Sequence, residues 1–196
     1  LPGGALVKNR LLLVPESIYA RTVDEVAKFG IQPHQVLVEP LGANTAAAFA
    51  DAAVRLAKRF GEDVVLSIGT TDHDIGRFDR LQTALEDIET LAALEPISGM
   101  LGIVPDAVHP DLGGVYAILG NPATAIPGVA EINRFQEKPE LEPWRTLTAA
   151  GALQNAGKHI VQARTLLRIF AAYVPDYAVA LARIRQALGT PEEAAD

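Results

Sequence analysis

The sequence predicts an α/β fold with a mostly parallel central sheet, flanked by helices, and mixed strands in its second half. Short apolar runs alternate with helical patterns through the first half of the chain, as successive β-α-β units require. These runs are continuously apolar, which indicates strands that are covered on both faces. In the second half the expected strands are separated by loops instead of helices, which favours antiparallel or mixed pairing there.

Three strand–helix pairs are expected in the first half of the chain. Each helix carries an apolar stripe at helical spacing, and glycines close the first two helices. The expected elements cover residues 11–14, 16–29, 36–38, 45–60, 64–68 and 78–94. Leu85, Ile88 and Leu91 lie on one side of the third helix, so that side is expected to face the core.

The second half is expected to hold more strands and shorter helices. The strands cover residues 99–104, 115–119, 129–135 and 158–161. A short helix is expected at residues 141–150. One or two more are expected within residues 166–188, interrupted at Pro175 because proline cannot continue a preceding helix.

The composition is that of an ordinary globular domain. Of the 196 residues, 49% are hydrophobic and 21% are charged, which argues against disorder and provides enough apolar material for one sizeable core. We therefore expect a single domain over residues 1–196. The chain begins with Leu1 instead of Met and shows no recognisable first element, so we expect this domain to be incomplete at its N-terminus.

Charge and cysteine content limit the kinds of partner and the cellular compartment that we expect for this protein. There are 17 Lys and Arg residues against 24 Asp and Glu residues, a net charge of −7, so no broad nucleic-acid surface is expected. The chain has no cysteine, and therefore no disulfide or thiolate site. No run is apolar enough for a membrane span or a signal peptide, so we expect a cytoplasmic protein without a membrane partner. The sequence leaves the oligomeric state open, a homo-oligomer included.

The first candidate binding stretch joins the second strand to the second helix. EPLGANTA, residues 39–46, combines the carboxylate of Glu39 with a glycine and an Asn-Thr pair. Asn44 or Thr45 can cap the helix, and Gly42 can relieve the turn. Alternatively, the same residues border a ligand, because strand-to-helix turns are where open α/β sheets bind ligands.

A polar loop with two carboxylates follows the third strand. Asp72, His73 and Asp74 come directly after a Gly-Thr-Thr segment. Mg²⁺ takes one or two protein carboxylates and keeps its other positions for water and phosphate oxygens, so this loop suits a magnesium site. The alternative is an Asp- and Thr-rich turn that starts the next helix.

Three further stretches carry weaker signals. In FQEKPE, Lys138 can face a phosphate as a point charge and Glu137 can accept hydrogen bonds from sugar hydroxyls, although such pairs also occur on solvated loops. The two glycines of LGGVY, residues 112–116, either allow a ligand close to the backbone or form a bulge. Asn155, within QNAG, either binds a hydroxyl-rich ligand or belongs to an ordinary turn.

Together and in this order, these stretches resemble the sugar-phosphate nucleotidyltransferases, and most closely the mannose-1-phosphate guanylyltransferases. That branch carries Glu-Pro-x-Gly-Arg-Asn-Thr-Ala, Pro-Ala-Asp-His, Thr-Gly-Tyr-Gly-Tyr, Glu-Lys-Pro and Trp-Asn-Ser-Gly. The counterparts here are EPLGANTA, TTDH, LGGVY, EKP and QNAG, and the resemblance covers residues 11–176. It implies a single nucleotidyltransferase-like domain with the Rossmann-like fold of the nucleotide-diphospho-sugar transferases.

The resemblance also implies a reaction and a set of roles. A sugar 1-phosphate attacks the α-phosphorus of a nucleoside triphosphate and pyrophosphate leaves, with Mg²⁺ or another divalent cation as cofactor. In this branch the substrates are GTP and mannose 1-phosphate, and one cleft at the mouth of the sheet gathers the site. The residues carried over are Glu39, Gly42, Asn44 and Thr45 for the nucleotide, Gly113, Glu137 and Asn155 for the sugar, Lys138 for its phosphate, Asp72 and Lys138 for catalysis, and Asp72 as the metal ligand.

The chain departs from the family pattern at several places. The N-terminal Gly-Gly-x-Gly-Thr-Arg-Leu loop that cradles the triphosphate is not found in these 196 residues, nor is the C-terminal Asp-x-Gly segment. The domain is therefore expected to be incomplete at both ends. Ala43 replaces the arginine of the first motif, Val115 replaces the second glycine of the tyrosine motif, and Gln154 replaces the tryptophan.

Three functions remain open on these grounds, and the sequence does not decide whether the protein is an enzyme. The first is a guanylyltransferase-like enzyme. The second is a catalytically inactive relative that binds nucleotide-sugars or regulates an active partner. The third is a nucleotidyltransferase for a different base or sugar. A strand and triphosphate loop encoded before Leu1 favour the enzyme, whereas a true start at Leu1 favours the binding protein.

Overall fold

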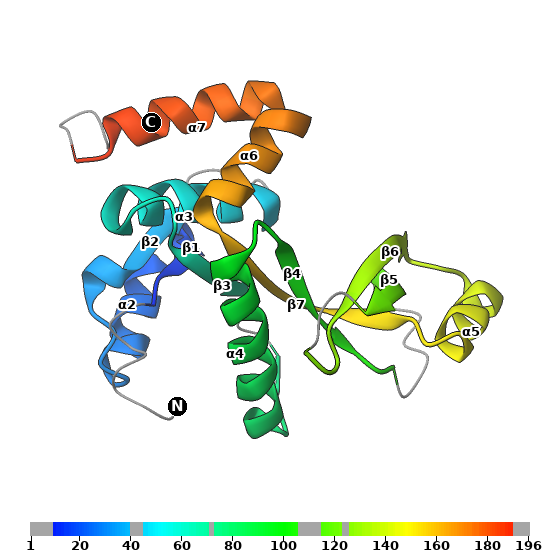
Figure 1. Ribbon diagram of the computed structural model, residues 1–196. Helices are drawn as coiled ribbons and strands as arrows, with labels where there is room; N and C mark the ends of the chain where they lie inside the picture. The colour runs from blue at the N-terminus through cyan, green and yellow to red at the C-terminus, as the bar shows by residue number, and fades with distance from the viewer. Residues whose placement is uncertain (1–9, 40–44, 71–72, 106–114, 123–125, 190–196) are drawn as a thin grey trace. The chain divides into compact units, whose positions relative to one another are not determined.

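The computed structural model describes residues 10–39, 45–70, 73–105, 115–122 and 126–189 (Figure 1). The chain divides into two compact units, Leu1–Ala52 and Ala53–Asp196. Helix α3, Thr45–Phe60, crosses that division. Among the helices in the described ranges, none is long and apolar enough to cross a membrane. The single domain expected over the whole chain stays a prediction.

A parallel strand pair and a helix precede α3 in the first unit. The described elements before α3 are β1 (Leu12–Pro15), the 3₁₀ turn η1 (Glu16–Ile18), α2 (Tyr19–Ala27), the 3₁₀ turn η2 (Pro33–Gln35) and β2 (Val36–Glu39). β1 and β2 run parallel, from Leu12 opposite Val36 to Pro15 opposite Glu39. Buried Val14 and Val36 meet the apolar stripe of α2, which lies between the two strands in the sequence. This pair is the part of the expected parallel sheet that the structure confirms.

The second unit holds the larger sheet and most of the helices. Its described elements are β3 (Val65–Gly69), α4 (Phe78–Leu94), β4 (Ser98–Ile103), β5 (Val115–Pro122), β6 (Ala130–Glu137), α5 (Leu141–Ala149), β7 (Leu153–Gln162), α6 (Ala163–Tyr173) and α7 (Pro175–Ala187). The sequence predicted these elements in this order. Strand β7 differs most from its prediction, because it already begins at Leu153 and so includes the QNAG stretch.

Strand β7 is the central strand of the larger sheet. β3 pairs with its C-terminal half, where Gly69 lies opposite Lys158, and β4 pairs along the other edge of β7. β5 pairs with its N-terminal residues, where Tyr116 lies opposite Gln154, and β6 pairs with β5. All of these pairs are antiparallel. In Figure 1, β7 continues from the β5–β6 hairpin to the start of α6.

The predicted mostly parallel, Rossmann-like sheet is wrong. The main sheet has five antiparallel strands, and parallel pairing among the described strands is confined to β1 and β2. The pattern misled because a short apolar run specifies neither the partner of a strand nor its direction. β3 is partly exposed along its length, as an antiparallel strand can be. Its partner β7 comes after the β5–β6 hairpin and α5, so no local pattern reports the pairing.

Helix α4 covers the larger sheet with the side that the sequence predicted. Ile88, Leu91 and Ala92 of this helix pack against Ile160 of β7, which is 0% exposed. Gly99 of β4 lies directly below Ile88, since a Cβ built on Gly99 would come within 2.5 Å of Cγ1 of Ile88. The missing side chain at Gly99 therefore sets how closely α4 approaches the sheet.

Gly99→Ala is expected to lower the free energy of unfolding by about 1–3 kcal/mol, because the added methyl group forces Ile88 or the whole helix away from the sheet. Urea unfolding followed by circular dichroism measures this loss. Gly120→Ala in β5 is the matched control, because a Cβ there would meet nothing closer than 3.6 Å. Equal losses in the two variants would contradict close packing of α4 on Gly99.

The turn before β3 anchors the two C-terminal helices. Ala163 donates its backbone N–H to the oxygen of Val64, and Arg164 donates its own to the oxygen of Glu62, each at 2.9 Å. The guanidinium group of Arg185 in α7 donates to the carboxylate of Glu62 at 2.6 Å, and this hydrogen bond lowers the pKa of Glu62. Both helices are thus held at the N-terminal end of β3, which leaves the other end of the strand to the polar loop.

Candidate functional site

Several predicted site residues fall outside the described ranges: Gly42, Asn44, Asp72 and Gly113. On the nucleotide side, Glu39 is the half-buried last residue of β2, and Thr45 is the exposed first residue of α3. Both belong to the first unit, whereas Glu137, Lys138 and Asn155 belong to the second. The single cleft expected for all of these residues therefore stays a prediction.

The described part of the site begins where β3 ends beside β7. Gly69, the last residue of β3, pairs with Lys158. The aliphatic part of Lys158 crosses the space above the glycine, because a Cβ built on Gly69 would lie 2.3 Å from Cδ of the lysine. The ammonium group donates a hydrogen bond of 2.8 Å to the backbone oxygen of Thr70. No sequence pattern signals this contact, because it depends on which strand pairs with β3.

Strand β7 is irregular next to this point. Along β4 the register passes from Met100 opposite His159 to Gly102 opposite Asn155, so β7 advances further than β4 over the same stretch. Gly157 lies within this bulge at φ 63°, in the left-handed region that favours glycine. Its N–H donates a hydrogen bond of 2.8 Å to Oδ1 of Asn155. The amide oxygen of Asn155 is therefore used inside the bulge, and its Nδ2 group is the part that can donate to a ligand.

The loop that follows β3 lies against this bulge. The position that a Cβ would take on Gly157 is 3.5 Å from Cε1 of His73 and 3.7 Å from Oγ1 of Thr70. TTDH and QNAG, which are far apart in the sequence, are therefore neighbours in the second unit. Asp72 lies between Thr70 and His73 in the sequence, and its own position is outside the described residues.

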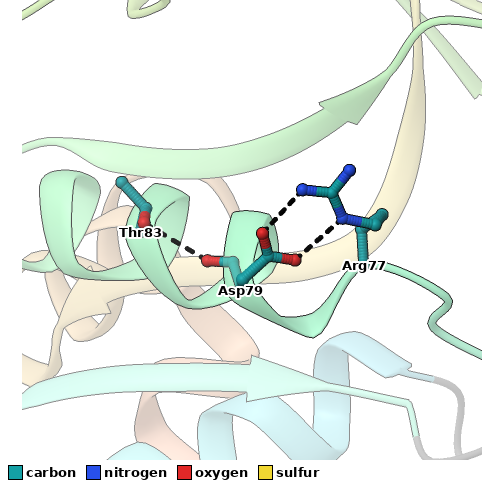
Figure 2. Close-up of polar contacts among 3 residues, drawn as sticks. All are labelled: Arg77, Asp79 and Thr83. Carbon is teal, nitrogen blue, oxygen red and sulfur yellow. Dashed lines mark hydrogen bonds and ion pairs between the residues drawn. The ribbon is translucent and has the colours of Figure 1, made fainter.

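The other end of the same loop is held at the start of α4 (Figure 2). Arg77 donates two hydrogen bonds to the carboxylate of Asp79, from Nε at 3.0 Å and from Nη2 at 2.7 Å. These bonds lower the pKa of Asp79 and raise that of Arg77. Thr83 donates its hydroxyl to the backbone oxygen of Asp79. Because Arg77 and Asp79 are exposed, the pair orients the helix start more than it stabilises the fold.

Glu137, the last residue of β6, lies on the same face of the sheet as Asn155, and Lys138 follows it directly in the sequence. Val115 pairs with Glu137, and the register of β5 with β7 continues to place Asn155 level with Val115. Asn155 and Glu137 are then two strand spacings apart, or about 10 Å. The ammonium group of Lys138 is 3.7 Å from the carboxylate of Glu137, and both side chains are 68% exposed. Such an ion pair adds little stability, so both groups can exchange it for a ligand.

Helix α5 contacts this part of the sheet through a hydrogen bond. Tyr116, the neighbour of Val115, is buried, and its hydroxyl accepts a hydrogen bond of 2.8 Å from Nε1 of Trp144 in α5. Neighbouring residues of a strand point to opposite faces. The contact between Tyr116 and Trp144 therefore lies on the face opposite to Asn155 and Glu137. Trp144 is the single tryptophan of the chain. Its rarity is the one feature of the sequence that could have marked it as a candidate.

A metal site is not built from the described residues alone. Within the described ranges, no group of three or more His, Asp or Glu side chains is arranged to hold a metal ion. The predicted divalent cation therefore depends on Asp72 and its sequence context.

Burial lowers the pKa of His159, which lies in β7 between β3 and β4. The unfolded chain takes up this proton near its ordinary pKa of about 6.5. The folded state takes it up only at lower pH, so stability falls as the pH drops below that value. We expect His159→Gln to lose less stability than the unaltered protein between about pH 7.5 and 5.5, measured by urea unfolding. The exposed His34→Gln variant is the control, and an unchanged pH dependence in His159→Gln would contradict this role.

Comparisons with known proteins find distant relatives that match most of this chain but only part of their own length. The chain matches no family model. The xanthan biosynthesis protein XanB of Xanthomonas campestris pv. campestris is 33% identical over 156 residues, which are 78% of this chain and 31% of that protein. The mannose-1-phosphate guanylyltransferase of Sinorhizobium fredii is 29% identical over 167 residues, which are 85% of this chain and 32% of that protein. The chain is a distant, partial homologue of these proteins. It spans about a third of their length.

Solved structures show the same fold. A protein from Thermus thermophilus, described as a mannose-1-phosphate geranyltransferase, superposes with a TM-score of 0.77 at 25% identity, over 94% of this chain and 50% of that one. The mannose-6-phosphate isomerase of Helicobacter pylori superposes with a TM-score of 0.74 at 22% identity, over 93% of this chain and 67% of that one. At that identity the second likeness concerns the fold alone.

Proposed function

We propose that this chain carries the sugar-phosphate side of a nucleotidyltransferase-like protein related to mannose-1-phosphate guanylyltransferase. The observation that supports this most directly is the contact of the TTDH loop, at Thr70 and His73, with the QNAG bulge at Gly157. A metal loop and a sugar-binding asparagine must be neighbours if they serve one reaction. The homology to mannose-1-phosphate guanylyltransferases points to the same reaction class.

In the proposed reaction, a phosphate oxygen of mannose 1-phosphate attacks the α-phosphorus of GTP. The bond from that phosphorus to its bridging oxygen breaks, and pyrophosphate leaves as GDP-mannose forms. Lys138 binds the sugar phosphate through its exposed ammonium group, Glu137 accepts hydrogen bonds from sugar hydroxyls, and Asn155 donates to a hydroxyl through Nδ2. A divalent cation at Asp72 offsets phosphate charge when it is bound.

The remaining assignments belong to the same proposal. Gly113 allows the sugar close to the backbone. Glu39, Gly42, Asn44 and Thr45 border the guanine. Ala43 and Val115, where the resembling family has arginine and glycine, favour a second candidate: a relative that binds a nucleotide-sugar without turnover.

Pyrophosphate release by the complete gene product distinguishes these candidates. With GTP, mannose 1-phosphate and Mg²⁺ together, we expect release that stops when any one of the three is omitted. Other nucleoside triphosphates and sugar 1-phosphates test the choice of base and sugar. Tight binding of GDP-mannose in calorimetry without any turnover identifies the inactive relative. A protein that shows no turnover and binds no nucleotide-sugar would overturn the proposal.

Asn155→Asp is expected to raise the KM for mannose 1-phosphate by about 10-fold, because it removes the Nδ2 donor and adds a charge near a phosphate. The carboxylate keeps the acceptor for the N–H of Gly157, so the free energy of unfolding should change little. Steady-state kinetics with each substrate varied in turn checks this. An equal rise in the KM for GTP would argue against a place for Asn155 beside the sugar.

A further inference from the structure

We propose that Lys158 is a positioning residue that holds the start of the loop after β3 against strand β7. Gly69 leaves the space that the lysine side chain needs to reach this loop. The three residues Lys158, Gly69 and Thr70 are called the latch below. The role assigned to the loop rests on the proposed function, but the latch itself rests on the contacts of these residues.

The first step is the crossing of the lysine over the glycine. Gly69 and Lys158 face each other in the β3–β7 pair. A Cβ on Gly69 would lie 2.3 Å from Cδ of Lys158, and 3.0 Å from both Cε and Nζ. Any side chain at position 69 must therefore displace the lysine from its path. Gly69 has no left-handed conformation that would require glycine, so the space above it is its reason to lack a side chain.

The second step is the hydrogen bond at the end of that path. Nζ of Lys158 donates to the backbone oxygen of Thr70 at 2.8 Å, directly after the last residue of β3. Hydrogen bonds from charged donors are stronger than those between neutral groups. β3 and its loop are thereby joined to β7 beyond the last paired residue of the ladder.

The third step is the second support beside the latch. Thr70 and His73 approach Gly157, which carries no side chain either and lies next to Lys158 in β7. The described ends of the loop therefore lie beside two glycines, Gly69 of β3 and Gly157 of β7, and beside Lys158. In the sequence Asp72 stands between Thr70 and His73, so we expect loss of the latch to weaken the binding of a cation there.

Cysteine chemistry tests the latch on this chain, because the sequence contains no cysteine of its own. Lys158→Cys removes the ammonium group, and alkylation with 2-bromoethylamine restores an ammonium group on a side chain of nearly the same length. Lys58→Cys on the exposed end of α3, treated in the same way, is the matched control. Gly69→Ala displaces the lysine without altering its charge, with Gly120→Ala as its control.

Hydrogen exchange of peptides covering residues 70–77 is the first measurement. We expect exchange there to accelerate by about 10-fold in Lys158→Cys, as for the loss of one hydrogen bond to a charged group, and to return after alkylation. Gly69→Ala should accelerate it as well, whereas the two controls should not. Unchanged exchange in both latch variants, or a failure of alkylation to restore protection, would overturn the proposal even if one variant folds poorly.

The Mg²⁺ dependence of pyrophosphate release is the second measurement. If the protein is an active nucleotidyltransferase, Lys158→Cys should raise the Mg²⁺ concentration for half-maximal rate, leave the KM for GTP unchanged, and recover on alkylation. An unchanged Mg²⁺ dependence would refute the link from the latch to Asp72. A protein that neither turns over nor binds a nucleotide-sugar, but whose loop exchange follows the predicted pattern, would overturn the proposed function and leave the latch standing.

Discussion

Ile160→Ala is expected to lower the free energy of unfolding by about 2–5 kcal/mol, the range for removing a fully buried aliphatic side chain. Ile160 is 0% exposed and lies in the C-terminal half of β7, with β3 and β4 on its two edges and α4 packed against it. The cavity left by the substitution cannot close easily, because the approach of α4 is already limited by its contact over Gly99. Urea unfolding, followed by circular dichroism, gives the loss directly.

Two variants bracket this result. Ile103→Ala makes the same chemical change at a 53% exposed position of β4, so its cost is expected to stay below about 1 kcal/mol. Ile160→Val removes a single methylene and is expected to cost about 0.5–1.5 kcal/mol, which keeps the test measurable if the alanine variant does not fold. A loss in Ile160→Ala no larger than that in Ile103→Ala would show that β7 is not the centre of the core.

Asp72→Asn is expected to lower kcat for pyrophosphate release by about 10²–10³-fold. The substitution keeps the size of the side chain but removes the charge that we propose to bind the divalent cation. The loss of several kcal/mol of transition-state charge stabilisation corresponds to that factor. The rate of pyrophosphate release at saturating GTP and mannose 1-phosphate, over a series of Mg²⁺ concentrations, measures the effect.

Asp74→Asn separates a specific metal ligand from a general effect of negative charge in the loop. Asp74 is exposed and lies just beyond His73, so the same change there tests the second carboxylate of the motif. We expect a much smaller loss of rate and no change in the free energy of unfolding for either variant. A normal rate in Asp72→Asn combined with a large loss in Asp74→Asn would place the cation on the other carboxylate.

The helices of this protein were predictable because their information is local. The apolar stripe and flanking residues of α3 and α4 gave both helices their observed ends, and the buried side of α4 at Ile88 and Leu91 followed from 3.6-residue periodicity. The strands were located in the same way. Their pairing was not, because an apolar run in β3 carries no mark of its partner β7, and the parallel arrangement expected for it was wrong.

In the candidate site, too, the residues in local motifs were predictable and the contacts that depend on strand pairing were not. The motifs named the residues, and the contact of Thr70 and His73 with Gly157 brings two of those motifs together. Lys158 and Trp144 were missed, since each acts on a residue that only strand pairing brings near: Thr70 in one case and Tyr116 in the other. A lysine at the start of an apolar run looks like an ordinary strand boundary. The glycine that makes room for it lies in another strand.

Because β7 is the central strand of the larger sheet, this sheet can form only late during translation. β3 and β4 leave the ribosome well before β7, and neither can complete its ladder until Gln162 has been added. Until then their apolar side chains and open edges are exposed to other nascent chains. Truncated chains that end before β7 should therefore be insoluble, and the need for chaperones during translation should end only when β7 emerges.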